Sequence, residues 1–141
     1  MLVFLKHLQF SILLLGLILV LTLMPSNEVP SSSGIQLDKI VHFILFFSFA
    51  FSLIIGLLKQ YFCKIMNRGA LKFTITIALS LAIVTEVLQY FMRVGRNFDW
   101  TDIGFNILGV LCAIIVFFWI KGKDDLFINL FFIIKITLEK L

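Results

Sequence analysis

Four long apolar segments constrain the fold of this chain more than any other feature. A helix needs about 20 apolar residues to cross the hydrocarbon core of a membrane, and open strands cannot satisfy their backbone groups in lipid. We therefore predict an all-α membrane protein, built as a bundle of four transmembrane helices. The expected spans cover residues 8–24, 40–58, 71–92 and 103–120.

The composition indicates one membrane domain. Hydrophobic residues make up 61% of the chain and charged residues only 14%, whereas an ordinary soluble domain is about 25% charged. The net charge of +4 is modest; it favours contact with anionic membrane lipids and does not indicate nucleic-acid binding. Cys63 lies in a predicted basic loop and Cys112 in a predicted apolar span, so neither a disulfide framework nor a metal motif is expected. No cofactor is expected, and no oligomeric state follows from the composition.

Basic residues predict the orientation of the bundle. They concentrate before the first span, between the second and third spans, and after the fourth. These residues are Lys6, Lys59, Lys64, Arg68, Lys72, Lys121 and Lys123. Because short cytoplasmic segments carry an excess of Lys and Arg, we predict that the N- and C-termini are both cytoplasmic. The loops after the first and third spans then face outward.

The two ends of the chain each leave an alternative open. The first segment could be a secretory signal, but it lacks a clear small-x-small cleavage pattern before Pro25, so we expect a retained helix. The last apolar stretch, 126–134, would cover only about 14 Å as a helix, too little to cross. We therefore predict a transmembrane domain at 1–123 and an amphipathic interfacial helix at 124–141, with a short fifth span as the alternative.

Polar residues recur at matched positions in three of the predicted spans. Asp38 and His42 are four residues apart, as are Asp102 and Asn106, while Glu86 and Gln89 are three apart; each pair therefore shares one helix face. The predicted topology puts all three faces at the outer end of the bundle, where a loop with Arg96 and Asp99 can fold over them. Ionisable groups cost roughly 2.5–3.5 kcal/mol each in lipid, so we predict that these eight residues form one ligand-binding site.

Each of these residues also has a structural interpretation. Asp38 and Asp102 could cap helices, and His42 could be a packed histidine. Gln89 and Asn106 could form hydrogen bonds between helices. A buried carboxylate must be protonated or paired, so Glu86 could form a salt bridge with Arg96. Gly104 and Gly109 could allow two helices to approach closely.

Three sequence patterns carry a resemblance to a known family. Residues 38–43 read D-K-x-x-H-F, residues 86–89 read E-x-x-Q, and residues 96–109 read R-x-x-D-x-x-D-x-x-x-N-x-x-G. In order and spacing this set resembles the VanZ-like family over about half the chain. The resemblance implies a multi-pass protein of the bacterial cytoplasmic membrane. The family is named for a member that raises resistance to the glycopeptide teicoplanin.

Two functions follow from the residues and the resemblance together. In the first, the site binds a lipid-linked cell-wall precursor, another envelope ligand or a lipoglycopeptide, with Arg96 holding an anionic group. In the second, the protein is a membrane-embedded enzyme that acts on a lipid-linked envelope substrate, with His42 and Glu86 as acid and base. A metal site at His42, Glu86 and Asp102 has no diagnostic spacing, so no metal is expected.

Overall fold

The computed structural model of the protein is helical throughout the part that it describes, residues 2–23, 35–59, 69–92 and 99–138, with side chains described at 6–22, 38–59, 69–91 and 99–123. Its elements are α1 (Leu2–Leu23), α2 (Ile35–Leu58), α4 (Ala70–Met92) and α5 (Trp100–Leu138). No strand occurs among these residues. The predicted all-α fold with four helices is confirmed.

Three of the four helices are long and apolar enough to cross a membrane. The segments that meet this requirement are Asp38–Leu58, Ala70–Phe91 and Trp100–Lys123, while the apolar segment of α1, Lys6–Thr22, is shorter. Large apolar side chains remain exposed on the outside of the bundle; Phe91 is 72% exposed and Ile115 66%. Such exposure is typical of a surface that lipid covers.

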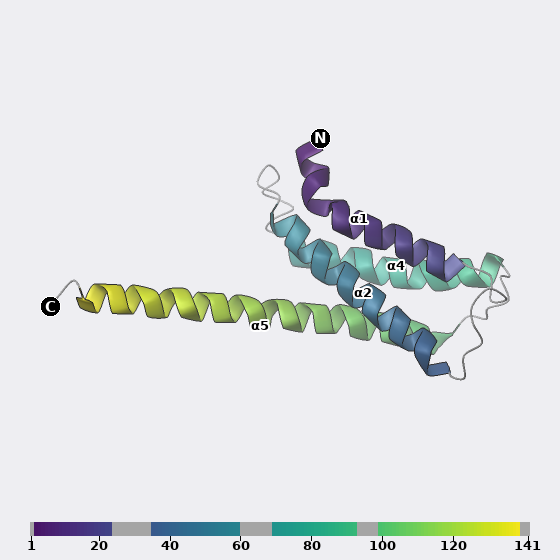
Figure 1. Ribbon diagram of the computed structural model, residues 1–141. Helices are drawn as coiled ribbons and strands as arrows, with labels where there is room; N and C mark the ends of the chain where they lie inside the picture. The colour runs from purple at the N-terminus through teal and green to yellow at the C-terminus, as the bar shows by residue number, and fades with distance from the viewer. Residues whose placement is uncertain (1, 24–34, 60–68, 93–98, 139–141) are drawn as a thin grey trace.

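The helices lie side by side and alternate in direction (Figure 1). The most extensive contact is between α2 and α5. We call one end of the bundle the mouth: α2 and α5 begin there, at Ile35 and Trp100, and α1 and α4 end there, at Leu23 and Met92. Which side of a membrane the mouth faces, and hence where the termini lie, stays a prediction.

Small residues bring the helices close together around an apolar core. Phe46 and Phe49 of α2 pack in this core, and Ala78 of α4 and Ala113 of α5 are fully buried. At Gly109 of α5 a Cβ atom would lie only 2.5 Å from the carbonyl oxygen of Phe43, so the absence of a side chain permits the approach of α5 to α2.

The interpretation of Gly104 as a packing residue is wrong, because a Cβ atom there would meet nothing within 4 Å. Gly104 and Gly109 are five residues apart on α5, which places them on different faces of the helix. Only the face with Gly109 lies against α2.

The last helix is longer than the predicted fourth span. It continues past Ile120 to Leu138, so no helix end separates the span from the predicted tail. No Pro interrupts residues 121–138, and one Gly in a helix interior costs only about 1 kcal/mol, so nothing there breaks the helix. The location of residues 124–141 at a membrane interface stays a prediction.

Candidate functional site

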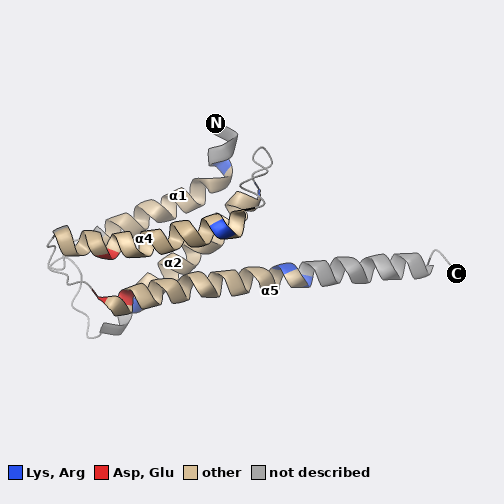
Figure 2. Cartoon of the chain, turned by 180° about the vertical axis from the view of Figure 1, so that it is seen from behind, with Lys and Arg blue, Asp and Glu red and all other residues tan. Residues whose placement is uncertain are grey.

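Charged and amide residues of three helices lie at the mouth, and Figure 2 shows acidic positions of α4 and of the start of α5 at this end of the bundle. Glu86 and Asn106 are fully buried, His42 is 3% exposed and Asp102 is 8% exposed. We call the whole group the mouth cluster. It consists of Asp38, Lys39 and His42 of α2, Glu86 of α4, Asp99 before α5, and Thr101, Asp102 and Asn106 of α5.

Lys39 joins the first turn of α2 to the start of α5. Its Nζ atom donates to Oδ2 of Asp99 at 3.2 Å, to Oδ1 of Asp102 at 3.3 Å and to the hydroxyl of Thr101. The Lys39 side chain is only 15% exposed. A charge at this depth requires partners, and the two carboxylates provide them.

Asp99 caps the N-terminus of α5. Its Oδ1 atom accepts the backbone N–H of Thr101 at 2.8 Å, which is the bond that an N-cap residue makes to the second helical residue. This bond, more than any other, holds the pKa of the Asp99 carboxyl below its usual value; the Thr101 side chain and Lys39 act in the same direction. The cap is therefore Asp99, while Asp102 lies at the third helical residue and faces α2.

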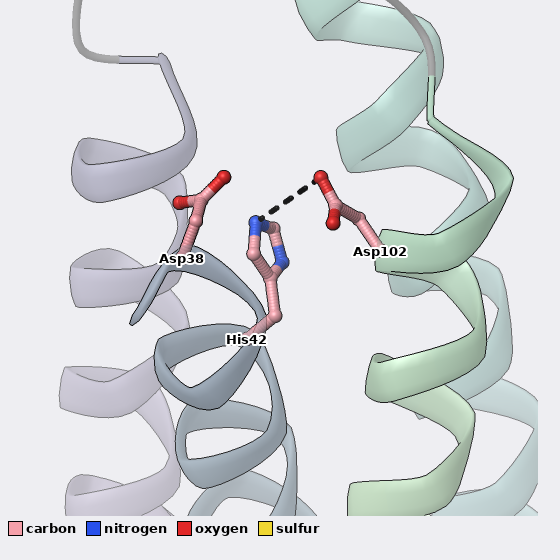
Figure 3. A group of neighbouring side chains, drawn as sticks. All are labelled: Asp38, His42 and Asp102. Carbon is pink, nitrogen blue, oxygen red and sulfur yellow. Dashed lines mark ion pairs between the residues drawn. The ribbon is translucent and has the colours of Figure 1, made fainter. Parts of the chain in front are cut away.

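His42 lies between the two helices with defined contacts on both ring nitrogens. Its Nδ1 atom is 3.0 Å from Oδ1 of Asn106, and its Nε2 atom is 4.0 Å from Oδ2 of Asp102. Figure 3 shows that the ring points into the space between the carboxylates of Asp38 and Asp102. One oxygen of each carboxylate and one ring nitrogen of His42 all lie within 4.8 Å of one another.

Glu86 approaches the cluster from α4. Its Oε2 atom accepts the backbone N–H of Asp99 over a long 3.5 Å, and its Oε1 atom has no hydrogen-bond partner in the described part of the chain. Arg96, its predicted salt-bridge partner, lies outside the described residues. The contact with Asp99 places the Glu86 carboxyl at the start of α5.

Gln89 has a different environment from the rest of the predicted site. Its Nε2 atom donates to the backbone carbonyl of Thr22 at 2.8 Å and so joins α4 to α1. This bond agrees with the structural interpretation of Gln89, a hydrogen bond between helices. Asn106 also links two helices, through His42. The structure thus brings together six of the eight predicted residues, Asp38, His42, Glu86, Asp99, Asp102 and Asn106.

Sequence reasoning did not include Lys39 or Thr101 in the site. The signal for Lys39 was present, because it follows Asp38 in the D-K-x-x-H-F pattern and is a basic residue on the predicted outer side. Thr101 carries no such signal: it lies in the cluster because it is the second residue of α5, next to the cap.

The comparisons with known proteins give one match. The family model VanZ/LLP1 matches residues 5–121, a range that includes every residue of the mouth cluster. No curated protein and no solved structure matches the chain.

Proposed function

Since this chain belongs to the VanZ/LLP1 family, we propose that it is a multi-pass protein of a bacterial cytoplasmic membrane that binds a cell-envelope ligand at the mouth cluster. The ligand is lipid-linked, as a cell-wall precursor is, or is itself a lipoglycopeptide. Through this binding the protein contributes to glycopeptide tolerance. The orientation that we infer from the basic residues places the mouth outward, where envelope ligands and glycopeptides meet the membrane.

The observation that carries this proposal is the burial of charged side chains at one end of an apolar bundle. His42, Glu86 and Asp102 are all less than 9% exposed. Buried ionisable groups destabilise a fold unless they are paired, and a cap or a single ion pair would not need them from three helices. A ligand-binding role accounts for their convergence.

A groove beside the cluster supports a ligand with an apolar chain. It lies between α4 and α5, has a volume of about 480 Å³, and is lined by apolar and aromatic side chains that include Val87, Trp100 and Ile103. Val87 follows Glu86 in sequence, and Ile103 follows Asp102. A lipid-linked ligand could thus place its polar group at the cluster and its chain in the groove.

Susceptibility to teicoplanin tests the tolerance part of the proposal. We expect a sensitive bacterial host that expresses the wild type to be protected, and we expect Glu86→Gln and Arg96→Ala to lose the protection at equal membrane levels. Lys72→Met, an exposed substitution at the opposite end of α4, is the matched control and should protect as the wild type does. An unprotected wild-type host would contradict the role in tolerance.

Ligand binding is tested separately, by native mass spectrometry of the full chain extracted in mild detergent. We expect an envelope lipid to remain bound to the wild type and to be lost from Glu86→Gln, with the control Lys72→Met retaining it. If Glu86→Gln retains the same lipid in the same amount, the cluster is not the binding site.

A second function is favoured by Oε1 of Glu86, which has no hydrogen-bond partner in the described part of the chain, and by the orientation of His42. A buried carboxyl and an imidazole held by Asn106 could serve as acid and base on a lipid-linked envelope substrate. We then expect overexpression of the wild type, but not of Glu86→Gln, to change the chemical composition of the envelope lipids. An identical lipid profile in both strains would count against the enzyme.

A further inference from the structure

Three side chains at the mouth offer atoms that divalent metal ions prefer as ligands. Asp38, His42 and Asp102 each contribute one such atom, and these atoms lie within 4.8 Å of one another. Two of the side chains come from the first turns of α2 and α5, and Figure 3 shows the three pointing toward one small space. Imidazole nitrogen with carboxylate oxygen is a donor set found in zinc sites.

The hydrogen bond to Asn106 orients the imidazole for metal binding. Nδ1 of His42 lies 3.0 Å from the amide oxygen of Asn106. Because that oxygen can only accept a hydrogen bond, the proton of a neutral ring lies on Nδ1 and Nε2 carries a lone pair. Metal-binding histidines commonly have such a partner on the other ring nitrogen, because it fixes the tautomer and the ring orientation. The lone pair on Nε2 then faces the carboxylates.

The distance from His42 to Asp102 is too long for a direct hydrogen bond and slightly longer than the distance between two zinc ligands. Nε2 and Oδ2 are 4.0 Å apart, and an N–H···O bond spans about 2.7–3.2 Å. Two atoms bound to one Zn²⁺ ion at about 2.0–2.2 Å in the tetrahedral geometry that zinc prefers lie about 3.3–3.6 Å from one another, so an ion would draw these two side chains slightly closer together. A cation between the two atoms also removes the repulsion between a lone pair and a carboxylate oxygen.

Lys39 does not occupy this position. It binds Oδ1 of Asp102, whereas the oxygen that faces His42 is Oδ2. An ion bound to Oδ2 would therefore leave the contact between Lys39 and Oδ1 in place.

Two buried atoms give an independent indication that a bound species is part of this region. Nδ2 of Asn106 and Oε1 of Glu86 are buried without a hydrogen-bond partner among the residues that the structure describes. Both residues are fully buried. An unpartnered buried polar atom is costly. Because the amide N–H of Asn106 is a donor and cannot bind a cation, a water molecule, free or bound to the ion, is the species that would satisfy both atoms.

We propose that Asp38, His42 and Asp102 hold a Zn²⁺ ion at the mouth, with Asn106 as a positioning residue and with coordination positions open to water or to the ligand. Three protein ligands with an open position are typical of zinc sites that bind a further molecule. This inference deepens the proposed function and rests on it in one respect: the ion would hold an anionic group, such as a phosphate, of the envelope ligand. Metal binding itself can be tested alone.

The test is zinc binding by the purified full chain in detergent, after removal of metal with a chelator. We expect isothermal titration calorimetry to show one Zn²⁺ ion per chain for the wild type. His42→Gln, Asp38→Asn and Asp102→Asn should each weaken binding by at least about tenfold, and Asn106→Leu should weaken it by roughly 10- to 100-fold, the usual effect of losing such a partner. Zn²⁺ should also raise the unfolding temperature of the wild type.

A matched control separates this site from general effects of losing a histidine. His7→Ala removes a histidine on α1, outside the mouth cluster, and should bind Zn²⁺ as the wild type does. If the wild type binds no Zn²⁺, His42 is a packed residue paired with Asp102 and the proposal is wrong. Equal binding by the wild type and all three ligand variants would also overturn it.

The outcomes also separate this proposal from the proposed function. Zinc binding by the wild type without teicoplanin protection or bound lipid would contradict the proposed function and leave the ion site in place. Protection and lipid binding without zinc binding would contradict the ion site and leave the proposed function in place. Retention of the wild-type unfolding temperature by each metal-free variant confirms that lost binding does not result from misfolding.

Discussion

Lys39 is the residue on which the geometry of the mouth cluster depends most directly. Among the residues whose side chains the structure describes, it is the one that contacts all three of Asp99, Thr101 and Asp102. Its Nζ atom also lies 6.0 Å from the centre of the Phe105 ring. These contacts hold the first turn of α2 against the start of α5, and they balance the carboxylates of Asp102, whose side chain is 12% exposed, and Asp99, whose side chain is 45% exposed.

We expect Lys39→Met to destabilise the protein by about 1.5–3 kcal/mol, the usual worth of hydrogen bonds to charged groups. The methionine keeps most of the side-chain volume but removes the ammonium group, so Asp99 and Asp102 lose their shared partner. Thermal unfolding in detergent measures the effect. Lys72→Met, at an exposed position, is the control, and equal unfolding temperatures for the two variants would contradict the role of Lys39.

Asp99 gives a prediction on stability at acid pH. Its pKa in the folded protein lies below the ordinary value of 3.8, chiefly because of the N–H of Thr101. A lowered pKa means that the ionised carboxylate stabilises the fold fully above the unfolded pKa, and that this stabilisation is lost as the pH falls through the folded pKa. We expect the unfolding temperature to fall more between about pH 6 and pH 3 for the wild type than for Asp99→Asn.

The two substitutions at Asp99 separate the cap from the charge. Asn is also a good N-cap, whereas Ala has no acceptor for the N–H of Thr101, so Asp99→Ala should cost about 1 kcal/mol at neutral pH. Asp99→Asn should lower the free energy of unfolding by less than Asp99→Ala does. If both variants match the wild type at neutral pH, the cap contributes nothing to the stability of α5.

At the scale of elements, the approach of α5 to α2 decides whether the residues of the site can meet. Gly109 lies three residues after Asn106, one turn of helix further into the bundle. Its Cα is so close to α2 that a Cβ atom would lie 2.5 Å from the carbonyl oxygen of Phe43 and 3.0 Å from the backbone nitrogen of Phe47. Backbone atoms cannot move aside as side chains do, so the helices themselves would have to separate.

We therefore expect Gly109→Ala to destabilise the protein by about 1–3 kcal/mol, the usual cost of overpacking. Gly104→Ala is the matched control on the same helix. It meets nothing within 4 Å and should be neutral or stabilise the protein by up to about 1 kcal/mol, because Ala favours the helix. Thermal unfolding of the two variants provides the measurement, and similar values for both would show that Gly109 does not limit the α2–α5 distance.

The helices could be predicted from the sequence because apolar length is a direct requirement of a membrane span. Their ends were less predictable. Residues 35–39 and 121–138 are helical although they are partly polar, because a helix can extend beyond the apolar segment and nothing in these residues breaks it. Length and hydropathy alone therefore identify the apolar centre of α2 and α5 but not their full extent.

The site was predictable to the level of helix faces but not of individual bonds. Spacing placed Asp38 with His42, and Asp102 with Asn106, and the topology placed these faces together. Spacing does not show how a helix is rotated or where it starts: Gln89 turns toward α1, and Asp99 rather than Asp102 caps α5, because α5 begins at Trp100. Those details depend on packing between helices.

At the scale of the whole molecule, the ligands that can reach the mouth cluster depend on which side of the membrane the mouth faces. The first turns of α2 and α5 lie at the mouth, and Lys121 and Lys123 lie about 20 residues further along α5, away from it. Figure 2 shows basic positions in this part of α5. The distribution of Lys and Arg predicts that this second region is cytoplasmic. The mouth cluster would then meet ligands of the outer leaflet.

Labelling of single cysteines in intact cells tests this orientation. With Cys63→Ser and Cys112→Ala as background, we expect a membrane-impermeant maleimide to label Trp100→Cys, at a position that is 76% exposed, and not Lys123→Cys. Lys123→Cys should become labelled only after the cells are permeabilised, which is the control for its reactivity. The opposite pattern would place the mouth in the cytoplasm, because a helix that crosses once has its two ends on opposite sides. The cluster could then bind lipid-linked precursors only before they leave the inner leaflet, and a direct encounter with an external glycopeptide would be ruled out.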